Sequence, residues 1–184
     1  MREQAALMQA VEAIKKGAVI AYATEGVYGL GCDPFQQQAV LRLLALKQRP
    51  IEMGVILVAA NLAQVELLIA WEAIPLAQQQ TIQQSWPGAV TWVVPATDKV
   101  PSWITGGRET VAVRVSAHPT VQQLCQAFGG PLVSTSANRN GEAPALDCQQ
   151  VQQTFPNILC VQGSLTTPNQ PSAIYDALSG QKIR

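Results

Sequence analysis

In the stretch Pro131-Leu132-Val133-Ser134-Thr135-Ser136-Ala137-Asn138, which decides the fold, an apolar run passes directly into polar residues. Pro131 to Ser134 is predicted to form a buried strand, and the preceding segment, Pro119 to Phe128, is predicted to form a helix that Gly129-Gly130 ends. A helix therefore leads into a strand, and in sheets covered by helices ligand clefts open where strands end. The polar residues that follow this strand are the first candidates for a binding site.

The same alternation of helices and strands extends over the rest of the chain. Apolar spacing and turn residues predict helices over residues 5–16, 37–47, 61–70, 75–85, 119–128 and 147–154. They predict strands over residues 18–22, 55–59, 89–94, 110–115, 131–134, 158–161 and 173–176. A glycine-containing loop is predicted from Thr24 to Gly31. Because no internal repeat interrupts this order, an α/β fold with a helix-covered sheet is expected.

Length and composition indicate one folded domain over residues 1–184. The chain is 48% apolar and 13% charged, and it contains no block of like charges, so no disordered tail is expected. Twelve basic residues balance twelve acidic residues, so the net charge gives no argument for nucleic-acid binding, which would need a local patch. No apolar stretch approaches the roughly 20 residues of a membrane span, and no secretory segment is recognised. A cytoplasmic location without membrane contact is expected.

The four cysteines, Cys32, Cys125, Cys148 and Cys160, are widely spaced. They form neither a Cys-x-x-Cys pair nor a cluster with the single histidine, His118, so no metal site is predicted. Disulfides are not expected either, because a domain this apolar does not need covalent links. His118 precedes a proline at a predicted helix start, and it is expected to lie at the surface or to cap that helix rather than to act in catalysis.

Lys47 and Arg49 stand where the predicted helix 37–47 ends. Pro50 disfavours the helical conformation at Arg49, and extended residues two apart share a face, which predicts a convergent cationic pair. Two cations together favour a polyanion such as a triphosphate. The alternative is that these basic residues only complement the dipole at the end of the helix.

Two further candidate features are the polar residues that follow the strand 131–134 and the arginine within the strand 110–115. If the extended geometry after Val133 continues, Ser134, Ser136 and Asn138 point the same way and line one wall of a cleft; a polar turn bonded to its own backbone is the alternative. Arg114 stands on the polar face of the alternating strand 110–115, where its guanidinium needs an anionic partner. That partner is a carboxylate of either a substrate or the protein, and the strand alone does not decide between them.

Four separated motifs resemble the YrdC/TsaC family of threonylcarbamoyl-AMP synthases, in order and in spacing. They are Thr24-Glu25-Gly26-Val27-Tyr28-Gly29-Leu30, Leu46-Lys47-Gln48-Arg49-Pro50, Val111-Ala112-Val113-Arg114-Val115 and Ser134-Thr135-Ser136-Ala137-Asn138. The resemblance runs from about Ala18 to Asp176. Within the family, the chain resembles the short bacterial type. It implies a twisted mixed sheet with flanking helices around a concave cavity. It also implies a nucleotidyltransferase that condenses L-threonine, bicarbonate and ATP, with Mg²⁺ accompanying ATP, and releases pyrophosphate. The product would pass to partner proteins that modify tRNA.

The resemblance also implies two sets of site residues. The residues expected to bind ATP are Lys47, Arg49, Thr110, Ser136 and Asn138, with the first two carrying the catalysis. The residues expected to bind threonine are Thr24, Arg114, Ser134 and Ser172. No residue is assigned as a metal ligand.

This chain departs from the family pattern at two places. Ala23 stands where the family has proline, and Ser164 to Ser172 replaces an expected glycine-rich stretch, with Pro168 at the position of an arginine. The main alternative is a non-catalytic RNA-binding or ribosome-maturation module that uses the same cavity. A phosphosugar enzyme similar to dihydroxybutanone phosphate synthase is a second alternative, but no acidic cluster stands at the glycine loop to support it.

Overall fold

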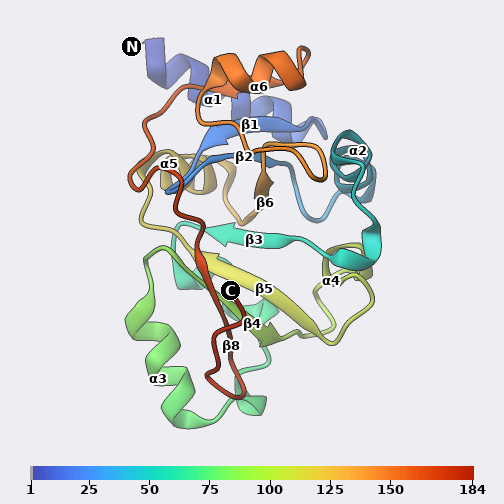
Figure 1. Cartoon of the computed structure of the whole chain (residues 1–184). Helices are drawn as coiled ribbons and strands as arrows, with labels where there is room; N and C mark the ends of the chain where they lie inside the picture. Colours follow the sequence, from blue (N-terminus) through green and yellow to red (C-terminus); the bar gives the residue numbers. More distant parts are fainter. Residues whose placement is uncertain (1) are drawn as a thin grey trace.

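In the computed structural model, which describes residues 2–184, helices and strands alternate around a single sheet (Figure 1). The α-helices are α1 (Arg2–Lys15), α2 (Gln37–Lys47), α3 (Leu76–Ser85), α4 (Ser102–Thr105), α5 (Pro119–Phe128) and α6 (Cys148–Thr154). The strands are β1 (Ile20–Ala23), β2 (Tyr28–Gly31), β3 (Ile56–Ala59), β4 (Val90–Pro95), β5 (Thr110–Val115), β6 (Leu132–Ser136), β7 (Leu159–Val161) and β8 (Ala173–Asp176).

The sheet is mixed, with the strand order β7-β1-β2-β6-β3-β5-β4-β8. Parallel pairs join β1 to β7, β3 to β5 and β4 to β8, whereas the other four neighbours are antiparallel. The strands rotate strongly from β1 to β8 in Figure 1, as a right-handed strand twist produces over many strands. The α/β class with a twisted mixed sheet is confirmed.

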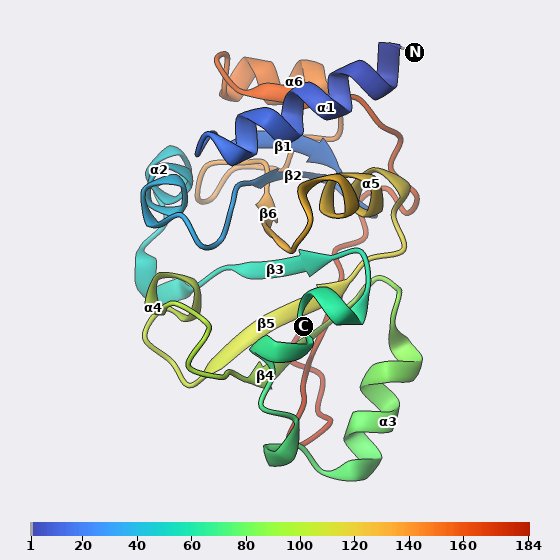
Figure 2. The ribbon, with the colours of Figure 1, turned by 180° about the vertical axis from the view of Figure 1, so that it is seen from behind.

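One face of the sheet is covered by α1 and α5, which lie side by side in front of it in Figure 2. Helical spacing on α1 turns Val11 and Ile14 inward, where they pack with Val121 and Leu124 of α5 in one buried cluster. On the opposite face, the C-terminal segment that leads to β8 crosses the sheet in Figure 1. A second buried cluster includes Leu43 of α2, Ile82 of α3 and Val151 of α6, so these helices also pack against the sheet.

Several predicted elements differ from the structure. Residues 61–70 form two short 3₁₀ helices, Leu62–Gln64 and Glu66–Leu68, because Val65 between them leaves the helical conformation (φ −124°, ψ −5°). The loop predicted from Thr24 to Gly31 contains the strand β2. A side chain at Gly31 would meet the carbonyl oxygen of Val133 in β6 at 2.4 Å, so only glycine permits the two strands to approach so closely there. The four-residue helix α4 was not predicted.

Cys148 and Cys160 form a disulfide, contrary to expectation. Cys148 begins α6 and Cys160 lies in β7, and the tertiary packing of these two elements brings their Cα atoms to 5.8 Å. Spacing along the chain gave no sign of this pairing. Cys32 and Cys125 are free and buried in the core.

No helix within residues 2–184 is both long enough and apolar enough to cross a membrane.

Candidate functional site

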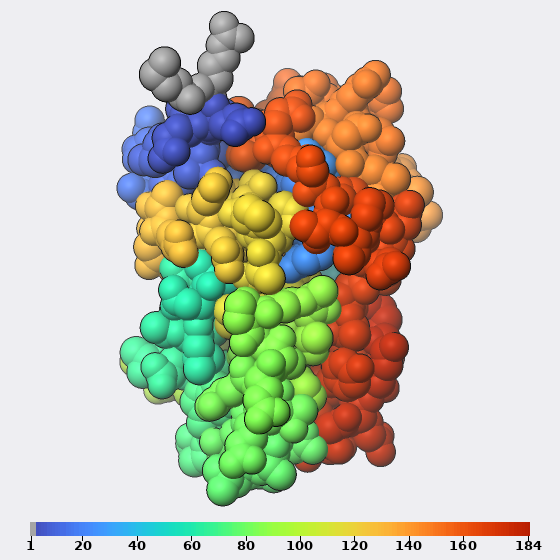
Figure 3. Space-filling view, turned by 90° about the vertical axis from the view of Figure 1, so that its left-hand side faces the viewer, coloured from blue at the N-terminus to red at the C-terminus, as the bar shows by residue number. Residues whose placement is uncertain are grey.

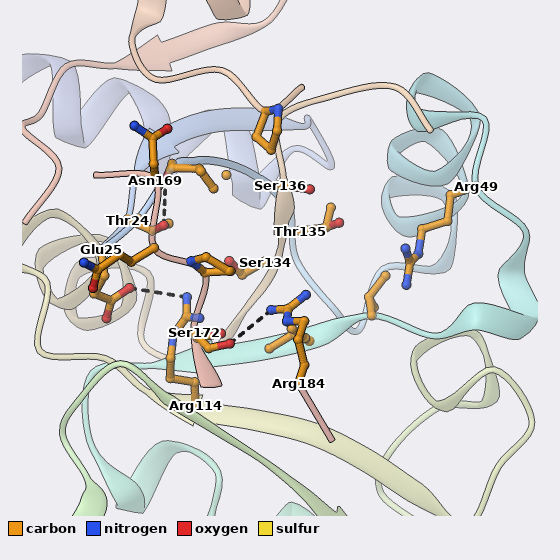
Figure 4. Close-up of a pocket in the computed structure, with 18 residues that line it drawn as sticks. Thr24, Glu25, Arg49, Arg114, Ser134, Thr135, Ser136, Asn169, Ser172 and Arg184 are labelled. Atoms are coloured by element: carbon orange, nitrogen blue, oxygen red, sulfur yellow. Dashed lines mark hydrogen bonds and ion pairs between the residues drawn. The ribbon is translucent and has the colours of Figure 1, made fainter. Parts of the chain in front are cut away.

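A cavity of about 430 Å³ lies between the glycine loop, the ends of β3 and β6, and the C-terminal segment (Figure 4). Stretches of the chain that are far apart in sequence meet there. The lining residues are Thr24–Val27, Gly29, Arg49, Val55, Ile56, Arg114, Ser134–Ser136, Pro144, Asn169–Ser172 and Arg184. Hydroxyls and cations therefore share one concave surface, as the site motifs predicted.

The end of β6 forms one wall of the cavity, as predicted. Ser134 and Ser136 line it, but Asn138 does not, because the strand ends at Ser136. The Asn138 side chain is used within its own loop: its Oδ1 accepts from the Ser136 hydroxyl at 2.6 Å, and its Nδ2 donates to the Glu142 carbonyl at 2.7 Å. Both sequence interpretations thus hold in part, with an extended wall followed by a turn bonded to itself.

Lys47 lies behind this wall and is only 4% exposed. Its ammonium group donates to the carbonyl oxygens of Ser136 and Asn138 and to Asn138 Oδ1 at 3.1 Å, so all three N–H donors of Lys47 hold the Ser136–Asn138 loop. The amine therefore fixes the position of the hydroxyl wall.

The predicted extended pair of Lys47 and Arg49 is wrong in its geometry. Lys47 is still helical, and Gln48 ends α2 in the left-handed conformation (φ 53°), with the Gln48 and Arg49 N–H groups bonded back to Ala45 and Leu44. The two side chains consequently diverge. Arg49 alone reaches the cavity, where its Nη2 donates to the Gly54 carbonyl at 3.0 Å.

The pKa of Lys47 is lowered to about 8, first by burial and then by the charge of Arg49. Raising the pH from 7 to 9.5 is expected to remove the Lys47 proton, since the lowered pKa brings deprotonation into this range. A neutral amine keeps two donors and loses its charge, so the Ser136–Asn138 loop should loosen, and affinity for ATP, the ligand that the sequence motifs predict, should fall. Calorimetric titration of ATP at several pH values measures this; Lys47→Met, which cannot titrate, should bind ATP weakly and show a flatter profile. The same dependence of ATP affinity on pH in the wild type and in Lys47→Met would contradict the assignment of this effect to Lys47.

Arg114 and Glu25 form a buried ion pair on the floor of the cavity (Figure 4). Their Nη2 and Oε2 atoms are 3.5 Å apart, and the side chains are 8% and 9% exposed. Ser116, which directly follows β5, donates its hydroxyl to Glu25 Oε1 at 2.6 Å. The protein thus supplies a carboxylate partner, one of the two kinds that the sequence left open.

The Arg114 guanidinium nevertheless keeps unused donor capacity. Within residues 2–184 it makes no hydrogen bond, and both Arg114 Nε and Glu25 Oε2 are buried without one. Buried charged groups are normally saturated with hydrogen bonds, so an arginine that lines a cavity in this state can receive an anionic ligand.

The segment Ser164 to Ser172, which departs from the family pattern, forms the opposite wall through its backbone. The Thr167 and Asn169 N–H groups donate to the carbonyl oxygens of Glu25 and Gly26 at 2.7 and 2.9 Å. Figure 3 shows this C-terminal part of the chain, in orange and red, packed over the N-terminal part in blue. Because main-chain groups make these bonds, the segment Ser164 to Ser172 can form this wall although its side chains differ from the family pattern.

His118 is buried at 2% exposure, so the expected surface position is wrong. It does stand at the N-cap position of α5, as the alternative predicted, but its side chain makes no capping hydrogen bond. Its ring Nε2 is 2.9 Å from the Ser164 carbonyl oxygen, and its backbone N–H donates to the Ser116 hydroxyl at 3.0 Å. His118 therefore joins the floor of the cavity to the beginning of the C-terminal wall.

The remaining predicted residues divide between the cavity and its surroundings. Thr24 lines the cavity while its hydroxyl donates to the Val27 carbonyl at 2.6 Å, and Ser172 lines it 3.1 Å from the Thr91 hydroxyl. Thr110 begins β5 outside the lining. Arg184, which sequence analysis missed, reaches the cavity and donates to the Ser172 carbonyl at 3.2 Å. No local motif marks it, because only the return of the chain end along β8 brings it there.

Within residues 2–184, no three histidine, cysteine or acidic side chains gather into a group that could hold a metal ion.

Comparisons with known proteins agree on one family. Residues 12–184 match the Sua5/YciO/YrdC family model, which carries the description "Telomere recombination". A threonylcarbamoyl-AMP synthase of Vibrio cholerae is 51% identical over 180 residues, covering 97% of this chain and 96% of that protein. A threonylcarbamoyl-AMP synthase of Pseudoalteromonas translucida is 47% identical over 186 residues, covering all of both chains.

Two solved structures resemble the fold. The P. abyssi Sua5 protein complexed with L-threonine has a TM-score of 0.86 at 33% identity, and the match covers 95% of this chain and 51% of that one. The E. coli YciO structure has a TM-score of 0.81 at 23% identity, covering 98% and 90% of the two chains, and this likeness shows the fold alone.

Proposed function

The chain belongs to the Sua5/YciO/YrdC family, and on that premise we propose that it makes threonylcarbamoyl adenylate from L-threonine, bicarbonate and ATP for tRNA modification. It is an enzyme, since relatives at about half identity over nearly the full length are named as synthases. The finer class that we propose is nucleotidyltransferase. These relatives favour synthesis over the alternative of a non-catalytic RNA-binding module.

The observation that carries the proposal is the buried Arg114 guanidinium, which lines the cavity without a hydrogen bond among the described residues. Its planar fork suits the carboxylate of threonine, with Thr24, Ser134 and Ser172 around the rest of that substrate. The threonine complex of the P. abyssi relative supports this choice of substrate.

The proposed reaction needs positioning and charge neutralisation rather than a protein nucleophile. Bicarbonate takes up a proton and loses water to give carbon dioxide, and the neutral amine of threonine adds to it and releases a proton, which forms the carbamate. An oxygen of this carbamate attacks the α-phosphorus of ATP, and the bond to the β-phosphate breaks to release pyrophosphate. Arg49 would bind the phosphates from the cavity wall, and Lys47 would hold the Ser136 wall at the nucleotide.

Mg²⁺ is proposed to enter with ATP. Glu25 is the only acidic side chain that lines the described cavity, and it is engaged by Arg114 and Ser116, so these side chains offer no acidic ligand set. An ion bound mainly by phosphate oxygens fits this surface. Transfer of the product to partner proteins, direct contact with tRNA and a cytoplasmic location remain parts of the proposal that rest on the family.

Pyrophosphate release from ATP tests the proposal directly. Release is expected to require both L-threonine and bicarbonate, because the attacking carbamate forms from both. Mass spectrometry of the product should detect threonylcarbamoyl adenylate. Release of pyrophosphate at the same rate without threonine would exclude the synthase. Salt-sensitive RNA binding by a protein that releases no pyrophosphate would favour the RNA-binding alternative.

A further inference from the structure

Arg108 lies in the turn between α4 and β5, and nothing in the proposed function uses it so far. The turn is made by Gly106 and Gly107, both with positive φ (67° and 81°). A side chain at Gly106 would lie 2.5 Å from the Glu52 carbonyl oxygen and 2.9 Å from the Gly54 nitrogen. The turn is therefore seated directly on the segment 52–54, and close backbone packing brings Arg108 there.

Two guanidinium groups meet on consecutive carbonyls of that segment. Arg108 Nη2 donates to the Met53 carbonyl oxygen at 2.7 Å, and Arg49 Nη2 donates to the Gly54 carbonyl oxygen at 3.0 Å. Arg49 Nε also donates to the Gly54 carbonyl oxygen, at 3.3 Å. One backbone carbonyl thus orients each side chain, and each guanidinium keeps further N–H donors for a ligand.

The pair lacks a compensating acid among residues 2–184. Among the described residues, neither guanidinium has a carboxylate within 4 Å, and the only ion pairs are Lys15 with Glu12 and Arg114 with Glu25. Burial and then the charge of Arg108 lower the pKa of Arg49, so the two cations lie within each other's field. Like charges held together favour an anion that contacts both.

We propose that Arg108 binds the pyrophosphate portion of ATP, extending the phosphate site outward from Arg49. This inference rests on the proposed function, in which Arg49 binds phosphate from the cavity wall. Arg108 lies outside the lining of that cavity and instead lines a second, more open hollow of about 520 Å³ with Thr97 and Ser102. Asp98 and Glu109 also line this hollow, but neither pairs with Arg108.

The chemistry of the leaving group explains why a second cation stands there. When the bond between the α- and β-phosphates breaks, the pyrophosphate takes the electron pair and gains negative charge. A guanidinium held in advance by the Met53 carbonyl stabilises that charge without reorganisation. Arg108 should therefore distinguish a nucleotide with β- and γ-phosphates from one that lacks them.

Equilibrium binding of AMP, ATP and inorganic pyrophosphate to Arg108→Ala tests the assignment. Affinity for ATP and for pyrophosphate is expected to fall about tenfold, as for loss of a charge-assisted hydrogen bond, while affinities for AMP and L-threonine change less than twofold. Arg108→Lys, which keeps the charge, should give an intermediate loss. The matched control is Arg42→Ala, since Arg42 is also exposed and donates to a backbone carbonyl, that of Gly17 at 2.8 Å.

A parallel loss of AMP and ATP binding would show that Arg108 only supports the segment that carries Arg49, and it would overturn the proposal. Unchanged ATP binding would overturn it too. Thermal unfolding of each variant identifies a folding defect, and Arg108→Lys supplies the comparison if Arg108→Ala is destabilised. Failure of the proposed function appears separately, as wild-type pyrophosphate release that does not depend on threonine.

Discussion

Replacing Arg114 with methionine is expected to weaken L-threonine binding at least about 100-fold, because the buried cation that would receive the carboxylate is removed. The same change leaves Glu25 buried with only the Ser116 hydroxyl as partner, so the free energy of unfolding should fall by about 3 kcal/mol. Isothermal titration with threonine and denaturant unfolding measure the two effects. Affinity for AMP should stay within about twofold of wild type.

A double variant separates the binding role of Arg114 from its structural role. Arg114→Met combined with Glu25→Gln removes both charges and keeps an acceptor for the Ser116 hydroxyl. Its stability should recover most of the loss, because no uncompensated charge remains buried. Threonine binding should stay lost. Recovery of threonine affinity together with stability would show that Arg114 has only a structural role.

Gly26→Ala is expected to displace the C-terminal wall of the cavity. A Cβ atom at Gly26 would lie 2.0 Å from the Gln170 carbonyl oxygen, a distance that requires the backbone to move. The Asn169 N–H bond to the Gly26 carbonyl holds that backbone in place, so the displacement should open the threonine side of the cavity. Threonine affinity should fall about tenfold or more, with a loss of about 1–3 kcal/mol in stability from the overpacked contact.

Gly130→Ala is the matched control for this substitution. A Cβ atom there would meet nothing nearer than the Phe128 ring at 3.8 Å, so threonine affinity and stability should stay close to wild type. Threonine affinity in Gly26→Ala equal to that of wild type would mean that the wall formed by Asn169 to Ser172 does not contact the substrate.

Much of the fold follows from patterns within single segments. Strand β5 was predictable because Val111, Val113 and Val115 alternate with polar or small residues, and α5 because Gly129 and Gly130 end a helical pattern. Such patterns arise because each helix or strand buries one of its faces, whichever other element packs against that face. They fail at 61–70, where helical spacing is present but the chain turns at Val65 into two 3₁₀ helices.

The site motifs were visible for a related reason, since each of them lies within a few residues. The wall at Ser134 and Ser136 and the cavity position of Arg114 and Arg49 agree with the sequence, although the orientation of Lys47 does not. That orientation is set by Gln48, whose left-handed conformation forms despite its side chain, because the helix end bonds its last N–H groups back to α2.

The sequence by itself determined the α/β class, the family motifs and the residue types at the cavity, because local periodicity and spacing encode them. Only the tertiary structure decided which groups meet: Glu25 with Arg114, Lys47 with the Ser136–Asn138 loop, Arg184 with Ser172 and Cys148 with Cys160. These contacts join residues separated by 12 or more positions, and no local pattern fixes such pairs. They depend on how the strands order themselves in the sheet, which the packing of the whole chain decides.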